Sequence, residues 1–117
     1  YESVLGCSRG REDEHWIDFN LYGHQLVCHL SNAASEQISN PVDGDNIPVP
    51  HFGVILDFRE FDALAERLRK NNQEFIVEPR TRFKGEAGEQ RTMFICDPSN
   101  NAIEFKAFAN LDTLFKP

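Results

Sequence analysis

The strongest constraint on the fold is the order of patterns after residue 50, where an apolar run precedes one amphipathic segment. Residues 51–57 are mostly apolar, which is typical of a central strand that is buried on both faces. The next segment has apolar residues at three- and four-residue spacing, as an amphipathic helix does: Phe58, Phe61, Leu64, Ala65 and Leu68. Asp57 can cap this helix, and Asn71-Asn72 can end it. A strand followed by a helix is therefore predicted.

Three further strands are predicted after the helix, at residues 74–78, 91–96 and 102–108. Pro79 ends the first of these strands, and a charged loop follows over residues 80–90. Residues 97–101 form a turn between the last two strands, and the tail makes one more helical turn. The second half of the chain therefore has the order β-α-β-β-β.

The first half repeats most of this order. Residues 1–6 resemble the end of a helix closed by Gly6, and a short strand over residues 7–11 follows. Residues 15–22 alternate between apolar and polar side chains, and with residues 24–30 they predict a hairpin. The order α-β-β-β is that of the second half without its first strand.

Residues 31–50 contain three prolines and show no periodicity, so they are predicted to be a connection, either a linker or a functional flap. The chain of 117 residues is expected to form one domain, with module one over 1–30, this linker, and module two over 51–117. The fold class is α+β.

Composition excludes several classes of protein. Twelve Lys and Arg against nineteen Asp and Glu give a net charge of −7, which argues against nucleic acid as a partner. No apolar run is long enough to span a membrane, and no signal peptide is visible. Three cysteines without close pairs indicate no disulfide framework, so we expect a reducing cytoplasm.

The clearest pair of chemical residues is His51 and Glu104. His51 opens the apolar strand, and Glu104 interrupts an apolar strand between Ile103 and Phe105. A buried, unpaired carboxylate is costly, so Glu104 must face water, a cation or a metal. Imidazole and carboxylate together are common ligands of divalent iron, manganese, zinc and nickel. The alternative is that both residues are polar strand residues that face solvent.

Other polar residues predict chemistry less directly. His24 and His29 lie five apart on one strand, so only one of them can face a cup formed by the sheet. Cys28 and Cys96 lie among apolar neighbours and are expected to be buried structural thiols.

The stretches HFGVILDFREFDALAERLRKNN and GEQRTMFICDPSNNAIEFKAF closely resemble the C-terminal module of the vicinal oxygen chelate superfamily. The ending DPSNNAIEF is the most specific part, and WIDFNLYGHQLVCHL resembles the first module of a subgroup named for dioxygenases. The superfamily includes glyoxalase I, bleomycin-resistance proteins, fosfomycin-resistance enzymes and extradiol dioxygenases. The resemblance covers essentially the whole chain.

The resemblance implies two βαβββ modules that form a curled mixed sheet around a metal. His51 and Glu104 match two of the family's metal ligands, and His29 lies near the position of an acid–base histidine. The remaining ligand in the dioxygenases is a histidine on the first strand of module one, a strand that this chain does not include. The dioxygenases also tend to carry a tyrosine about ten residues before the carboxylate ligand, where this chain has Phe94 or a neighbour and no tyrosine.

The leading functional expectation is an extradiol-like dioxygenase that uses iron(II) or manganese(II), with His29 as general acid or base. Its substrate would be a small molecule that chelates the metal through adjacent oxygens. A glyoxalase-like or fosfomycin-resistance-like enzyme, with zinc or nickel as further metals, is the second expectation. A metal-free drug-binding protein of the bleomycin-resistance kind is the third. The resemblance also implies a homodimer.

Overall fold

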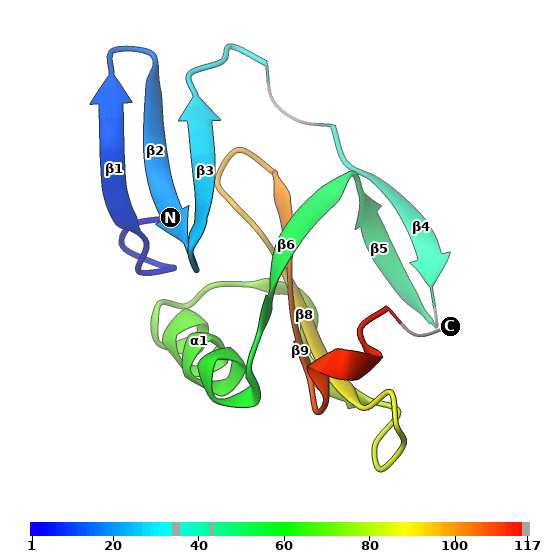
Figure 1. The fold of residues 1–117 in the computed structure, drawn as a ribbon. Coiled ribbons are helices and arrows are strands. Elements are labelled where there is room, and N and C mark those ends of the chain that lie inside the picture. The colour runs from blue at the N-terminus through cyan, green and yellow to red at the C-terminus, as the bar shows by residue number, and fades with distance from the viewer. Residues whose placement is uncertain (34–35, 43, 116–117) are drawn as a thin grey trace.

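The computed structural model describes residues 1–33, 36–42 and 44–115. Its strands form three sheets, and one α-helix lies against the largest of them (Figure 1). The elements are β1 (Ser8–Asp13), β2 (Trp16–Leu21), β3 (His24–His29), β4 (Ile38–Val42), β5 (Asp45–Val49), β6 (His51–Leu56), α1 (Phe58–Lys70), β7 (Phe75–Arg82), β8 (Gln90–Cys96), β9 (Ala102–Phe108) and the 3₁₀ turn η1 (Leu111–Thr113).

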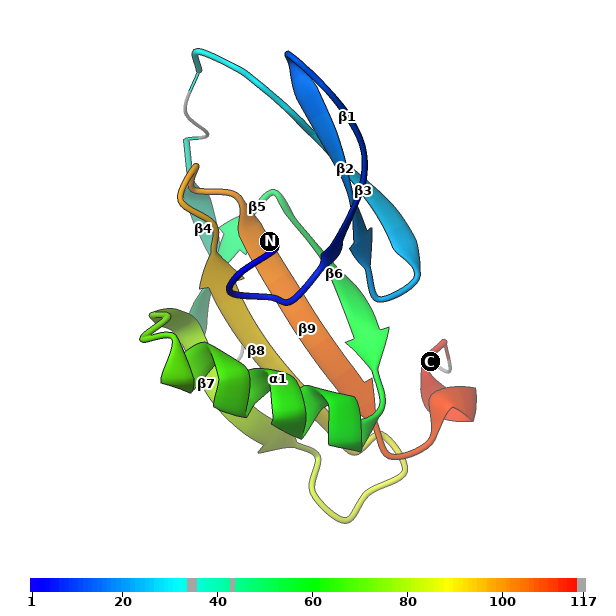
Figure 2. The same ribbon diagram turned by 90° about the vertical axis from the view of Figure 1, so that its left-hand side faces the viewer.

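The second module forms a four-stranded mixed sheet in the order β6-β9-β8-β7. The first and last strands of the module are neighbours, because β6 runs parallel to β9 with Gly53 opposite Glu104. Helix α1 covers one face of this sheet, and the β4–β5 hairpin lies on the opposite side (Figures 1 and 2). We call the side of the hairpin the open face. The predicted β-α-β-β-β order is confirmed.

Helix α1 starts and ends where the sequence indicates. Asp57 accepts a hydrogen bond from the backbone of Glu60, and the Glu60 side chain accepts one from the backbone of Asp57, which completes a capping box. Asn71 caps the other end, and Asn72 has a positive φ of 54°. The predicted apolar positions face the sheet, and the buried ones are Phe61, Leu64, Ala65 and Leu68.

The core joins the two modules. Its most deeply buried side chains belong to the second module: Phe61, Leu68, Met93, Ile103 and Phe105. Leu5, Cys7 and Leu21 of the first module are buried in the same cluster. Tyr1 also links the modules, because its ring stacks on Phe19 and its hydroxyl donates to Asp97.

The first module has the predicted hairpin, with β2 and β3 antiparallel and β1 on the other side of β2. The segment before β1 is a single turn closed by Gly6, whose φ is +76° and whose N–H donates to the carbonyl of Glu2. The fold is the expected α+β arrangement of βαβββ type, and its sheets do not close into a single barrel. None of the described helices has the length and apolar character needed to cross a membrane.

Within residues 31–50, expected to be a connection without periodic structure, β4 and β5 form an antiparallel hairpin that the sequence analysis did not predict. Prolines lowered the expectation of strands, since a proline cannot donate to a sheet ladder. Pro41 and Pro48 fit because both strands of a two-stranded ribbon are edges, where an N–H directed outward is not needed.

Two predicted details of the large sheet are also corrected. Strand β6 is an edge strand, so Ile55 and Phe52 are exposed while Val54 and Leu56 face the core. Strand β7 does not stop at Pro79, because the opposite edge of the sheet accommodates the proline beside an irregularity in register between Val77 and Arg80. The charged loop is correspondingly shorter than residues 80–90.

Candidate metal centre

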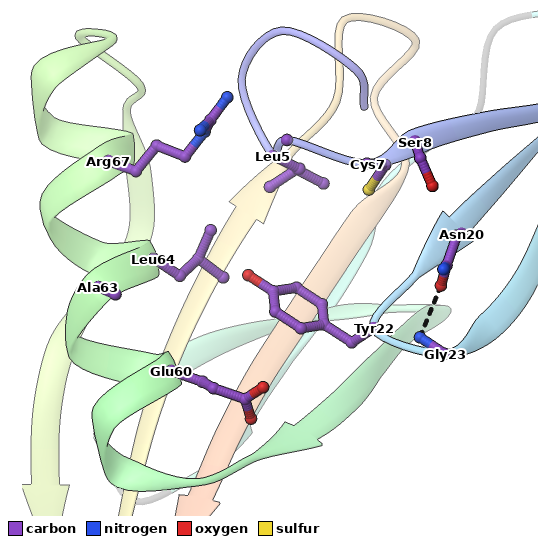
Figure 3. Close-up of a pocket in the computed structure, with 11 residues that line it drawn as sticks. Leu5, Cys7, Ser8, Asn20, Tyr22, Gly23, Glu60, Ala63, Leu64 and Arg67 are labelled. Carbon is purple, nitrogen blue, oxygen red and sulfur yellow. Dashed lines mark hydrogen bonds between the residues drawn. The ribbon is translucent and has the colours of Figure 1, made fainter.

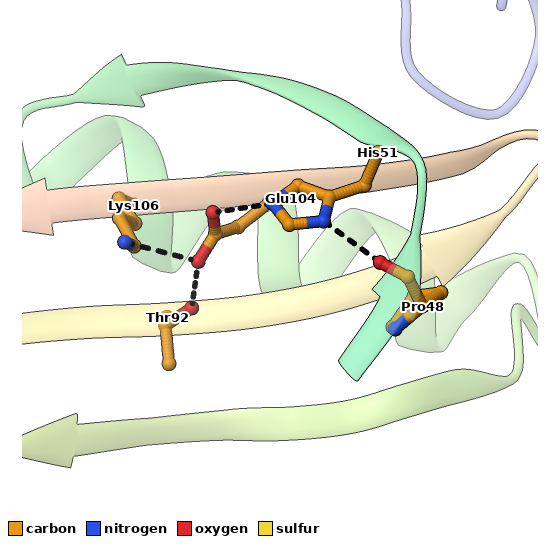
Figure 4. A network of polar contacts seen from close by, with 5 residues as sticks. All are labelled: Pro48, His51, Thr92, Glu104 and Lys106. Atoms are coloured by element: carbon orange, nitrogen blue, oxygen red, sulfur yellow. Dashed lines mark hydrogen bonds and ion pairs between the residues drawn. The ribbon is translucent and has the colours of Figure 1, made fainter. Parts of the chain in front are cut away.

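His51 and Glu104 meet on the open face of the large sheet. They lie on neighbouring parallel strands, and the Nε2 atom of His51 is 3.5 Å from the Oε2 atom of Glu104. One strand pairing thus spans their sequence separation of 53 residues. The predicted pair is brought together (Figure 4).

The second nitrogen of the imidazole fixes its tautomer. The Nδ1 atom of His51 lies 2.8 Å from the carbonyl oxygen of Pro48, which can only accept a hydrogen bond. Nδ1 must therefore carry a proton, and in the neutral ring Nε2 then presents a lone pair toward the carboxylate. Two acceptors facing each other need a proton or a cation between them. Backbone carbonyls orient metal-binding histidines in this way in many proteins.

The donor separation fits a metal ion. Ligand bonds of about 2.0–2.2 Å place neighbouring donors roughly 3.0–3.5 Å apart on one ion. The 3.5 Å between Nε2 and Oε2 lies within this range. The side chain of Glu104 is 16% exposed and that of His51 is 31% exposed, so the pair is accessible from solvent. These two residues could therefore share a divalent cation.

Thr92 and Lys106 hold the other oxygen of the Glu104 carboxylate. The Thr92 hydroxyl donates to Oε1 at 3.0 Å, and the Nζ atom of Lys106 lies 3.3 Å from the same oxygen (Figure 4). Both contacts orient the carboxylate and leave Oε2 directed to His51. The predictions missed both residues, although Lys106 stands two residues after Glu104 and so shares its face.

Phe94 lies directly opposite Glu104 on β8 and beside His51. Its ring meets the imidazole of His51 edge-on at 5.1 Å between centroids, and the residue is only 3% exposed. Phe94 therefore packs an apolar ring against His51, and this ring cannot exchange a proton.

No third ligand joins the pair within the described ranges 1–33, 36–42 and 44–115, where no three histidine, cysteine, aspartate or glutamate side chains form a set that could hold a metal. His51 and Glu104 thus fit part of a metal site.

His29 lies on a different sheet. It is exposed on β3, and with Phe52 and Asp97 it lines a cavity of about 800 Å³ between β3 and the 97–101 turn. Its catalytic role stays a prediction. Cys28 lines the same cavity, and burial raises the pKa of its thiol. Cys28 and Cys96 are only partly buried, which corrects the expectation of buried thiols at both positions.

A second cavity, of about 550 Å³, separates helix α1 from the first module (Figure 3). Leu64 and Tyr22 project into it from opposite sides. Arg67 borders it and donates to the backbone carbonyls of Ser3 and Val4, which fastens the N-terminal turn to the helix. Burial raises the pKa of Cys7 at this cavity. Its polar contacts are structural.

Comparison with known proteins supports the same family. A crystal structure of a glyoxalase/bleomycin resistance protein/dioxygenase from Alicyclobacillus acidocaldarius is 31% identical and has a TM-score of 0.77. The alignment covers 98% of this chain and 85% of that chain. The fosfomycin resistance protein FosX from Listeria monocytogenes has a TM-score of 0.67 at 18% identity, over 95% of this chain and 79% of its own, and supports the fold.

Other comparisons add little. No family model matches the sequence. Human nephrin is 27% identical over 89 residues, but the match spans 73% of this chain and only 7% of nephrin, so it carries no functional argument. The structure from Alicyclobacillus acidocaldarius is similar over 98% of this chain and 85% of its own. The chain therefore belongs to the glyoxalase/bleomycin resistance protein/dioxygenase family, within the vicinal oxygen chelate superfamily.

Proposed function

We propose that this chain is a divalent-metal enzyme in which His51 and Glu104 bind the metal. The observation that carries the proposal is the hydrogen bond from His51 to Pro48, which leaves the Nε2 lone pair facing the Glu104 carboxylate at 3.5 Å. A purely structural ion pair would be expected to close to about 2.7–2.9 Å, as charge-assisted hydrogen bonds do. Iron(II) or manganese(II) is the proposed metal, and zinc or nickel is the alternative.

The proposed reaction is extradiol-like cleavage of a small substrate that offers two adjacent oxygens. A divalent metal lowers the pKa of bound hydroxyl groups and orients the substrate. The protein would contribute the fixed imidazole of His51, the carboxylate of Glu104 oriented by Thr92, and an apolar wall at Phe94. His29 is proposed as general acid or base, because an imidazole can both donate and accept a proton. We further propose that the protein is a cytoplasmic homodimer.

Chemistry of the fosfomycin-resistance or glyoxalase type is the second candidate, and Lys106 favours it. An ammonium group 3.3 Å from the ligand carboxylate provides positive charge for an anionic substrate. A structure of a FosX variant from Listeria monocytogenes contains manganese(II) and 1S,2S-dihydroxypropylphosphonic acid, and its TM-score with this chain is 0.68. Phe94 also favours this second candidate, because the dioxygenases tend to carry a tyrosine near this position and this chain does not.

Metal analysis tests the proposal. Full-length protein purified without chelator should contain about one iron or manganese per chain by mass spectrometry, and Glu104→Gln should lose it. Glu78→Gln is the matched control, because Glu78 is an exposed carboxylate on β7, and this variant should keep the metal. Oxygen uptake with catechols, or turnover of methylglyoxal–glutathione, then separates the two reactions. Wild-type protein that takes up no metal even after reconstitution would refute the proposal and favour a drug-binding protein.

A further inference from the structure

The open face beside Glu104 carries a row of cationic side chains. Arg80, Thr92 and Lys106 lie directly opposite one another on β7, β8 and β9. Directly opposed residues point to the same face, so both cations flank Thr92 on the face that holds the metal pair. Two strand spacings separate Arg80 from Lys106, about 10 Å between backbones.

Among the described residues, not every hydrogen-bond donor of Arg80 has an acceptor. Its guanidinium pairs with Asp45 of the β4–β5 hairpin, yet its Nε atom is buried and has no hydrogen-bond partner in the described part of the chain. A buried donor without an acceptor costs free energy, and native proteins keep few of them. Asp45 alone therefore does not satisfy the guanidinium, and an anion reaches the buried Nε atom only when the side chain shifts.

Among the described residues, Lys106 pairs with a single carboxylate, Glu104, which has a second role. Its ammonium contacts Oε1 of Glu104, whose other oxygen faces His51. A metal bound by Glu104 would compete for the carboxylate's charge and leave Lys106 with unbalanced positive charge. Among the described residues each cation of this row is paired with one carboxylate, Arg80 with Asp45 and Lys106 with Glu104. In a chain of net charge −7, the row therefore becomes a local positive charge only when Glu104 is bound by a metal or replaced. Such a local positive charge favours an anion.

We propose that the substrate carries an anionic group, a carboxylate, phosphate or phosphonate, and that Lys106 and Arg80 bind this group above Thr92. The inference deepens the proposed function and rests on it for the second half of the ligand, the adjacent oxygens at the metal. Anionic oxygens accept strong hydrogen bonds from ammonium and guanidinium groups. When no anion is bound, Asp45 of the β4–β5 hairpin pairs with Arg80 and keeps its guanidinium in place.

The first test is independent of the metal. Inorganic phosphate is titrated into metal-free protein and followed by amide chemical shifts, which should move saturably at Arg80, Thr92 and Lys106. Lys106→Met should weaken phosphate binding at least tenfold, whereas Lys84→Met, which removes the same charge from an exposed loop residue, should leave it unchanged. Arg80→Lys keeps the charge and the hairpin contact and should retain partial affinity.

Glu104→Gln adds a second variant to this test, because it removes the negative charge that pairs with Lys106. Phosphate should bind this variant more tightly than wild type, by about tenfold, and Glu78→Gln should show no such gain. Absence of saturable shifts in wild type and Glu104→Gln, or equal phosphate affinity in Lys106→Met and wild type, would overturn the inference.

The second test uses metal-loaded protein and two diols that differ by one carboxylate. By calorimetry, 3,4-dihydroxybenzoate should bind at least tenfold more tightly than catechol, and Lys106→Met should abolish this preference by weakening the binding of 3,4-dihydroxybenzoate at least tenfold more than that of catechol. Equal affinities would overturn the proposed substrate class. Phosphate binding with the predicted pattern, together with failure to load metal, would refute the proposed function and leave the anion site standing.

Discussion

Replacement of Gly53 by alanine should disrupt the candidate metal centre, because it forces apart the two strands that carry His51 and Glu104. Gly53 lies opposite Glu104 where β6 meets β9, and a Cβ atom there would stand 1.8 Å from the carbonyl oxygen and 2.7 Å from the carbonyl carbon of Glu104. Ordinary van der Waals contact begins near 3.5 Å, so the strands would have to separate by about 1.5 Å. The obstacle is backbone, which cannot rotate away as a side chain can.

The expected cost is about 3 kcal/mol. Overpacking alone costs about 1–3 kcal/mol, and each lost backbone hydrogen bond adds roughly 1 kcal/mol. A chain of 117 residues has an unfolding entropy of about 0.25 kcal/mol per kelvin at its midpoint. Gly53→Ala should therefore lower the Tm by about 12 °C. Since the same displacement moves His51 relative to Glu104, the variant should also bind metal at least tenfold more weakly.

Thermal unfolding and metal titration measure both effects. Gly88→Ala is the matched control, because a Cβ atom at Gly88 would meet nothing within 4 Å. A Tm for Gly53→Ala within about 2 °C of that control would show that β6 and β9 are not as closely apposed as described, and the pairing that brings His51 to Glu104 would be in doubt.

Three further changes test separate parts of the structure. Thr92→Val removes the 3.0 Å hydrogen bond to Glu104 and should weaken metal binding about tenfold by calorimetry, and unchanged affinity would show that the hydroxyl does not orient the carboxylate. Asp57→Ala removes the helix cap and should cost about 1 kcal/mol in urea unfolding, and a loss below about 0.3 kcal/mol would contradict the capping role. Burial and the bond to Asp97 raise the pKa of the Tyr1 phenol, so the unfolded chain ionises first and the free energy of unfolding should fall above about pH 10. Tyr1→Phe should make that alkaline decline shallower, and an equally steep decline would refute this cause.

Sequence patterns predicted the parts of the fold that depend on local signals. The helix cap at Asp57 and the apolar stripe of α1 are local, and both are confirmed. The β-α-β-β-β order allows its first and last strands to be neighbours, and the parallel register of β6 and β9 shows that they are. His51 and Glu104 could be paired in advance for this reason, although neither side-chain contacts nor the tautomer could be known.

The remaining features depend on neighbours that sequence periodicity does not reveal. A continuous apolar run such as residues 51–57 has the same appearance in a central strand and in an edge strand, and here β6 is an edge. Pro48 reduced the expectation of a strand, yet it lies in β5 and its carbonyl holds His51. Thr92 was missed because its hydroxyl is one of many in the chain until β8 and β9 are aligned.

The β4–β5 hairpin connects these observations. Pro48 of β5 fixes the tautomer of His51, and Asp45 of the same strand holds Arg80 on the open face. One short ribbon therefore orients a candidate metal ligand and a candidate anion-binding group, although the sequence suggested only a connection. Since both contacts come from β5, a displacement of the ribbon would alter both ends of the site together.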